Sequence, residues 1–275
     1  MAREHGVEIG FGQWMIIGVP VALILLGAAW VVLTALNPVK LVLPEAGVLF
    51  REERARLGRM TGPEKRVSVI FALAAGAWIF RPLLTPFAPW LTDTGIAIAA
   101  AVALAFVPAA GFRSERLVTD AELKRLPWGV LTLFGGGLSL ADAISDSGLA
   151  AWLGQLLGVL GAWPVAALVV IVTLAMIFLT ELTSNTASAA TFLPIGGALA
   201  LAIGADPLLF AIPLALAASC AFMLPVATPP NAIVYGAGLI SIGQMSRAGL
   251  WLNIIGVVAI SAIALIAVPL IFAAS

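Results

Sequence analysis

The chain has 275 residues, of which 62% are hydrophobic and 10% are Asp, Glu, Lys or Arg. Soluble domains carry about 25% charged residues, so this composition excludes an ordinary water-soluble protein. The 14 basic and 14 acidic residues cancel, which leaves no basic surplus for binding nucleic acid. With one cysteine and one histidine, the chain offers neither a zinc cluster nor a Ser-His-Asp set, and we expect no enzyme.

The first predicted element is an apolar run over residues 11–36 that contains no charged side chain. It is long enough to cross a bilayer. It is too long, and too weakly preceded by positive charge, to be a cleaved signal peptide. We therefore expect residues 1–36 to hold a transmembrane helix of an all-α integral membrane protein.

Two polar loops follow, at residues 37–66 and 111–126. Together they hold eleven of the fourteen Lys and Arg residues. Because basic loops of membrane proteins stay on the cytoplasmic side, both loops are predicted to be cytoplasmic, in a multi-pass protein of the cell inner (plasma) membrane. Residues 45–60 are predicted to form a helix lying on the membrane surface.

The rest of the chain consists of apolar runs, several of them too short to span. They cover residues 67–80, 95–110, 127–144, 149–160, 164–179, 187–203, 208–223, 231–242 and 250–274. Short runs broken by Gly, Pro and polar residues favour re-entrant hairpins and discontinuous helices, which occur where the backbone is buried or lines a cavity. We expect six or seven true crossings.

The first break lies at residues 180–188, where seven of nine side chains are polar. Such a cluster is costly inside a membrane unless it binds something. A helix that begins after Ser184 and Asn185 would direct unpaired N–H groups and partial positive charge at an anion. The alternative is a cluster of Ser, Thr and Asn side chains that bonds neighbouring helices.

The second break is the sequence from Pro225 to Asn231, which has three prolines in six residues. Proline removes backbone donors and interrupts helices, and the carbonyls thus freed can coordinate a small hard cation. The alternative is a simple proline kink. Together, the two breaks are typical of a secondary-transporter site, in which helix ends face an anion and unwound carbonyls hold Na⁺.

At these residues the sequence resembles the divalent anion/sodium symporter family. The matching stretches are residues 127–138 with a glycine triplet, 180–194 with Ser184-Asn185-Thr186, and 218–238 with Thr228-Pro229-Pro230-Asn231. The resemblance implies two inverted repeats, each with a re-entrant hairpin and an unwound helix. It also implies a homodimer in which a transport domain moves against a scaffold as an elevator.

The resemblance further implies the roles of particular residues. The predicted substrate-binding residues are Ser184, Asn185, Thr186 and Pro229. The predicted sodium site comprises Thr180, Thr183, Asn185 and Ala227, largely through backbone carbonyls. Na⁺ is the implied coupling ion, and no organic cofactor is expected. Glu181, the one acid at this break, is either a sodium or proton partner or a structural carboxylate bonded to N–H groups.

Only one copy of each motif is present, whereas the family has a pair. We therefore expect one inverted-repeat half of an elevator-type transporter. Either the polypeptide is truncated, or a separate chain supplies the N-terminal repeat. The third alternative is that the half-site pairs with the same half-site of a second copy in a dimer. The predicted regions are 1–36 closing the missing repeat, 37–66 cytoplasmic, 67–162 scaffold-like, and 163–275 the transport-domain half. This last region contains a re-entrant hairpin at 164–204 and a broken helix at 208–242.

The predicted function is sodium-coupled transport of a small di-anion across the lipid bilayer. A C4-dicarboxylate is the first choice of substrate, with citrate or sulfate as alternatives. Three other readings stay open: a sodium-independent anion exchanger, a proton-coupled permease of the same superfamily, and a non-transporting half-transporter fragment.

Overall fold

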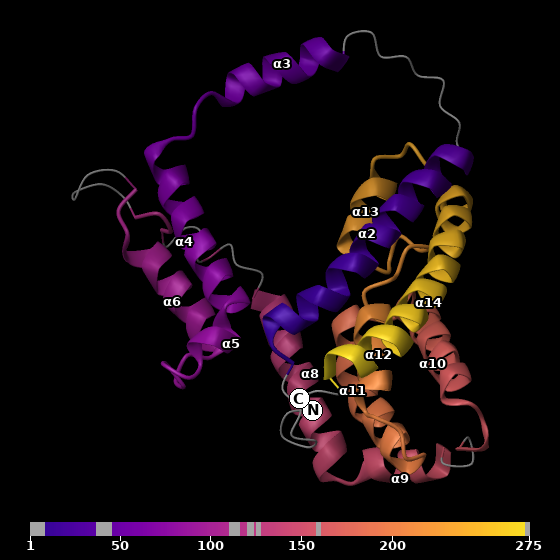
Figure 1. The fold of residues 1–275 in the computed structure, drawn as a ribbon. Coiled ribbons are helices and arrows are strands. Elements are labelled where there is room, and N and C mark those ends of the chain that lie inside the picture. The colour runs from indigo at the N-terminus through magenta and orange to yellow at the C-terminus, as the bar shows by residue number, and fades with distance from the viewer. Residues whose placement is uncertain are drawn as a thin grey trace. The chain divides into compact units, whose positions relative to one another are not determined.

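A computed structural model describes residues 9–36, 46–109, 116–119, 124, 128–157 and 161–272. The regular elements formed by the described residues are helices, and none is a strand, in agreement with the predicted all-α class (Figure 1). The helices are α2 (Phe11–Leu36), α3 (Ala46–Leu57), α4 (Gly62–Ile79), α5 (Arg81–Leu84), α6 (Asp93–Phe106), α8 (Trp128–Asp146), α9 (Leu149–Leu157), α10 (Val165–Thr180), α11 (Asn185–Ala202), α12 (Leu208–Ala217), α13 (Pro229–Gly236) and α14 (Ile242–Phe272).

The chain divides into two compact units. One contains most of α2 together with α8 to α14, and the other contains the first residues of α2 together with α3 to α6. The later boundary between the units falls between residues 127 and 128, so α8 and α9 lie in the same unit as α10 to α14. Both interrupted segments therefore belong to a single unit.

Two of the described helices, α2 and α14, are long and apolar enough to cross a membrane by length and composition. Helices α6, α10 and α12 are also apolar but shorter. The predicted basic loops are described only in part, because residues 37–45 and most of 111–126 lie outside the described residues.

The smaller unit is organised by polar contacts at its helix ends. Thr61 and Glu64 form a reciprocal capping box at the start of α4, and these hydrogen bonds lower the pKa of the exposed Glu64 carboxyl. Arg81 forms an ion pair with Asp93 at 2.9 Å, which joins α5 to the start of α6. The Trp78 indole donates to the Asp93 carbonyl at 3.1 Å, so α4 and α6 pack as an antiparallel pair.

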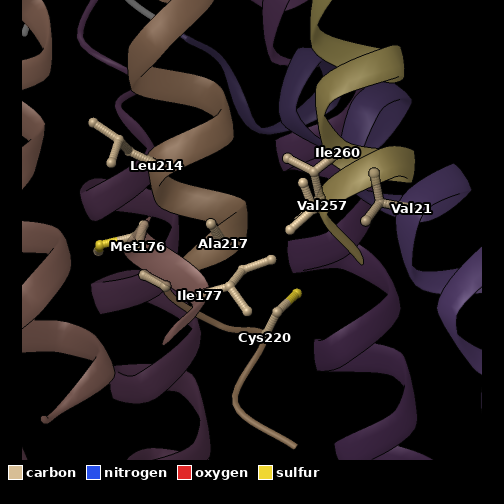
Figure 2. Close-up of a cluster of buried hydrophobic side chains, with 9 residues drawn as sticks. Val21, Met176, Ile177, Leu214, Ala217, Cys220, Val257 and Ile260 are labelled. Carbon is tan, nitrogen blue, oxygen red and sulfur yellow. The ribbon is translucent and has the colours of Figure 1, made fainter. Parts of the chain in front are cut away.

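The larger unit has its core where α2, α10, α12 and α14 meet (Figure 2). The buried members of this core are Val21, Met176, Ile177, Leu214, Ala217, Ala218, Cys220, Val257 and Ile260. Ala217, Ala218 and Cys220 lie at and just after the end of α12, so the apolar core borders the second helix break.

The close approach of α9 to α11 requires a glycine at position 154 of α9. A Cβ atom at this position would lie 2.8 Å from the backbone oxygen of Ala198 on α11. In contrast, a Cβ at Gly135 or Gly136 of the glycine triplet would meet no atom of the described residues within 4 Å. The described glycines of the triplet therefore make no close helix contact, and α9 and α11 approach each other at Gly154 instead.

We predict that Gly154→Ala lowers the free energy of unfolding by about 1–3 kcal/mol, because the added methyl group must displace the α11 backbone. The measurement is thermal unfolding of the purified protein in detergent. Gly136→Ala is the matched control inside α8, and it should not lower the unfolding midpoint, since alanine favours helix over glycine where there is space. Equal midpoints for the two variants would contradict the assignment of the α9–α11 contact to Gly154.

Candidate functional site

Both predicted breaks are present as interruptions between helices of the larger unit. Helix α10 ends at Thr180 and α11 begins at Asn185, which leaves an interhelical turn of residues 181–184. Helix α12 ends at Ala217 and α13 begins at Pro229, which leaves an unwound segment of residues 218–228. This segment starts earlier than the prolines, and Pro229 and Pro230 occupy the first turn of α13, where proline is well tolerated.

The unwound segment is held by the carboxylate of Glu181, which is only 3% exposed. Oε1 accepts from the backbone N–H groups of Phe222 and Met223 at 2.8 and 2.9 Å. Oε2 accepts from those of Met223 and Leu224 at 3.1 and 3.0 Å. All these donors are N–H groups, which suits an ionised carboxylate because it only accepts. Of the two readings of Glu181, this geometry favours the structural one.

Glu181 also replaces the helical partners of three N–H groups in the segment that follows α12. In a continuous helix, the N–H of Phe222 would bond to the carbonyl of Ala218, four residues earlier. Because Glu181 accepts this N–H and the next two, the carbonyls of residues 218–220 lose their usual helical partners. The carboxylate thus substitutes for three helical acceptors and leaves carbonyl oxygens available for other contacts.

The carbonyls on the other side of the unwound segment are satisfied by side chains. The Asn231 amide donates to the carbonyls of Ala221 and Leu224 at 2.9 and 3.0 Å. The Ser246 hydroxyl of α14 donates to the carbonyl of Met223 at 3.2 Å. Buried backbone groups need such partners, and here they come from two separate helices, α13 and α14.

Three oxygen atoms gather at the end of α10. The hydroxyl of Thr180, which is fully buried, lies 2.6 Å from Oδ1 of Asn185 and 3.0 Å from the carbonyl oxygen of Ala218. A hydroxyl has one proton, so two acceptors share a single donor in this arrangement. The cluster joins the interhelical turn to the unwound segment, and its all-oxygen composition is the kind that binds hard cations.

The hydrogen bonds of Thr183 and Ala227 go to groups outside this oxygen cluster. The Thr183 hydroxyl bonds to the carbonyl of Leu179 and to the hydroxyl of Ser188, at 2.9 and 2.6 Å. Ala227 donates its N–H to the carbonyl of Leu224 within a turn. Pro229 is exposed in the first turn of α13. Of the four predicted sodium-site residues, the hydrogen bonds therefore bring together Thr180 and Asn185.

The N-terminus of α11 has a serine at its N-cap that does not cap it. Ser184 makes no side-chain bond to the first turn, and its hydroxyl instead lies 3.1 Å from that of Thr186. Helices α4, α6 and α13 differ, because a threonine caps each of them. The first N–H groups of α11 thus lack the side-chain cap that its sequence offers, which favours an anionic partner.

Two site residues were missed by sequence reasoning. Ala218 has no side-chain signal, since its contribution is a backbone carbonyl. Asn253 of α14 is fully buried and donates to Glu181 Oε1 at 2.8 Å. Its signal was available, because an asparagine in the middle of an apolar run is a functional candidate in a membrane helix.

A strongly apolar, all-helical chain with two helix breaks joined by buried polar groups is typical of a secondary transporter. Comparison with known proteins agrees with this class. The model of the family described as the sodium:sulfate symporter transmembrane region matches residues 1–272, so the chain belongs to this family. The expected resemblance is confirmed, and so is the expectation that the chain is no enzyme, since the family is one of transporters.

Similar proteins include two named sodium-dependent dicarboxylate transporter SdcS. The protein of Staphylococcus saprophyticus is 43% identical over 270 residues, covering 96% of this chain and 52% of its own length. That of Staphylococcus aureus is 43% identical over 277 residues, covering 98% of this chain and 53% of its own length. The chain thus spans about half the length of these relatives.

We predict that Glu181→Gln lowers the free energy of unfolding by about 3 kcal/mol, because it replaces a charged acceptor and turns an amide N–H₂ group toward backbone donors. Thermal unfolding in detergent measures the effect. The exposed Asp142→Asn on α8 removes the same charge elsewhere and should change the midpoint little. A Glu181→Gln variant as stable as Asp142→Asn would contradict the structural role of Glu181.

Proposed function

We propose that this chain forms part of a carrier that couples sodium entry to the transport of a C4-dicarboxylate. The observation that carries the proposal is the position of Asn185. Its side chain belongs to the oxygen cluster with Thr180 and Ala218, while its backbone begins the uncapped N-terminus of α11. One residue would therefore contact both the proposed sodium site and the proposed anion site.

Charge considerations support coupling between the two sites. Arg247 is the one basic residue in the sequence from position 163 to the end. Within this region, the groups that can balance a di-anion near α11 are therefore the helix N-terminus and a bound cation. Opposite charges close together in a low-dielectric site attract strongly, so each ion increases the affinity for the other.

The chemistry of the residues fits the proposed substrates. Na⁺ would be held by Thr180, Asn185 and the Ala218 carbonyl, with Thr183 and Ala227 as further backbone contributors. The carboxylates of the di-anion would meet the hydroxyls of Ser184 and Thr186 and the first N–H groups of α11, with Pro229 beside them. The names of the SdcS relatives favour a dicarboxylate over citrate or sulfate.

The transporting form, as we propose it, combines this chain with a second, inverted half. The relatives are about twice as long as the matched region, and the sequence carries one copy of each motif. In this form, α10 and α11 make a re-entrant hairpin in a transport domain that moves as an elevator within a homodimer. The loops at 37–66 and 111–126 would face the cytoplasm.

Uptake of radiolabelled succinate into proteoliposomes tests the function. Two preparations are compared: this chain alone, and a chimera in which it replaces the matched half of SdcS from S. aureus. Sodium-dependent uptake by the chimera, abolished when choline replaces Na⁺, is the expected result. Uptake that persists in choline would contradict sodium coupling and favour an exchanger or a proton-coupled permease. No uptake by a folded chimera would contradict transport.

We predict that Thr180→Val and Asn185→Ala each reduce sodium-dependent succinate uptake by at least about tenfold, because each removes an oxygen of the cluster. Thr173→Val is the matched control. Thr173 is also fully buried on α10, but its hydroxyl bonds to the carbonyl of Val169 in its own helix. Similar losses in Thr173→Val and Thr180→Val would show that the position of the hydroxyl is unimportant.

A further inference from the structure

We propose that one face of α14 is a platform that positions the unwound segment and thereby sets the sodium affinity of the site. The platform consists of Ser246, Gly249 and Asn253. These residues have the spacing i, i+3 and i+7, which places them along one side of a helix. The consequence for sodium rests on the proposed function, whereas the positioning role concerns the described contacts alone.

Gly249 allows the backbone of the unwound segment to lie directly on α14. A Cβ atom at this position would lie 2.3 Å from the carbonyl oxygen of Phe222 and 2.5 Å from the Cα of Met223. These are backbone atoms, so a side chain at position 249 would displace the segment itself. A Cβ atom at Gly243, on the same helix, would have none of the described atoms within 4 Å.

Asn253 holds the carboxylate that in turn holds the segment. Its Nδ2 donates to Glu181 Oε1 at 2.8 Å, while its own buried Oδ1 has no hydrogen-bond partner among the described residues. An unsatisfied buried acceptor is destabilising, so packing alone does not favour asparagine over leucine here. The favourable contact is the hydrogen bond that the Asn253 amide donates to Glu181. It stabilises the carboxylate without adding a second charge.

Ser246 completes the platform about one helical turn before Gly249. Its hydroxyl donates to the carbonyl of Met223, the residue whose N–H bonds to both oxygens of Glu181. The N–H groups of the segment are thus held by Glu181, and the carbonyl of Met223, between the two carbonyls that Asn231 holds, is held by α14. Because Ala218 belongs to the same segment, the distance between its carbonyl and Thr180 depends on how the segment lies on α14.

Cys220 provides a direct reporter of this positioning. It is the single cysteine of the sequence, lies in the unwound segment, and is 4% exposed. Its rate of alkylation by a small maleimide, measured on the purified full chain in detergent without sodium, reports how often the segment leaves the platform. We expect faster alkylation in Gly249→Ala, Asn253→Leu and Ser246→Ala than in the unmodified protein.

Two substitutions on α14 serve as matched controls. Gly243→Ala adds a methyl group where there is space. Ser261→Ala removes a buried hydroxyl that bonds to no other group in the described part of the chain. Both should keep the slow alkylation of the unmodified protein. Ser246→Ala removes one hydrogen bond without adding volume, so it tests the platform even if a bulkier variant fails to fold.

The second readout is the sodium dependence of succinate uptake by the chimera. Asn253→Leu should raise the half-activating sodium concentration by about tenfold or more, since a hydrogen bond to a charged group contributes at least that factor. Maximal uptake at saturating sodium should change much less, which separates positioning from general damage. Glu181→Asp should shift sodium activation less than Glu181→Gln.

The outcomes separate this inference from the proposed function. Unchanged alkylation in all three platform variants would overturn the platform, whatever the transport result. Faster alkylation with unchanged sodium activation would overturn the link to sodium affinity. An unmodified chimera that shows no sodium-dependent uptake would count against the proposed function, and the sodium-free alkylation rates would still decide the positioning role.

Discussion

The buried carboxylate of Glu181 is the interaction on which the rest of the site depends. It accepts hydrogen bonds from three consecutive backbone N–H groups, those of Phe222, Met223 and Leu224. Leaving such groups unpaired in an apolar surrounding is costly, so a buried helix break requires a hydrogen-bond acceptor from another part of the chain. A carboxylate supplies two oxygens with several lone pairs and is therefore well suited to this role.

This arrangement links local backbone geometry to the chemistry of the site. Accepting the N–H of Phe222 releases the carbonyl of Ala218 from helical bonding, and Thr180, the residue before Glu181, contacts that carbonyl. Two adjacent residues thus act on the same segment. Glu181 accepts its N–H groups, and Thr180 contacts one of the carbonyl oxygens that are exposed where the helix is unwound. We infer that the turn and the unwound segment move together, because separating them would break these bonds at once.

Much of the fold could be predicted from the sequence, because apolar runs and polar breaks are local signals. The long first helix and both interruptions were found in this way. The sequence predicts that the second break begins at Pro225, because the prolines are the visible signal and residues 218–224 contain no helix breaker. In the structure the break begins earlier, at residue 218. The acceptor of the unwound N–H groups, Glu181, lies 41 residues before Phe222, and another partner of Glu181, Asn253, lies 72 residues after Glu181. Such distant pairings leave no periodicity in a single sequence.

The most direct test of the central claim is an experimental structure of the protein determined with and without Na⁺. We expect the ion among the oxygens of Thr180, Asn185 and Ala218, with Glu181 keeping its bonds to the three N–H groups in both states. An ion coordinated by the Glu181 carboxylate, with those N–H bonds broken, would contradict the account.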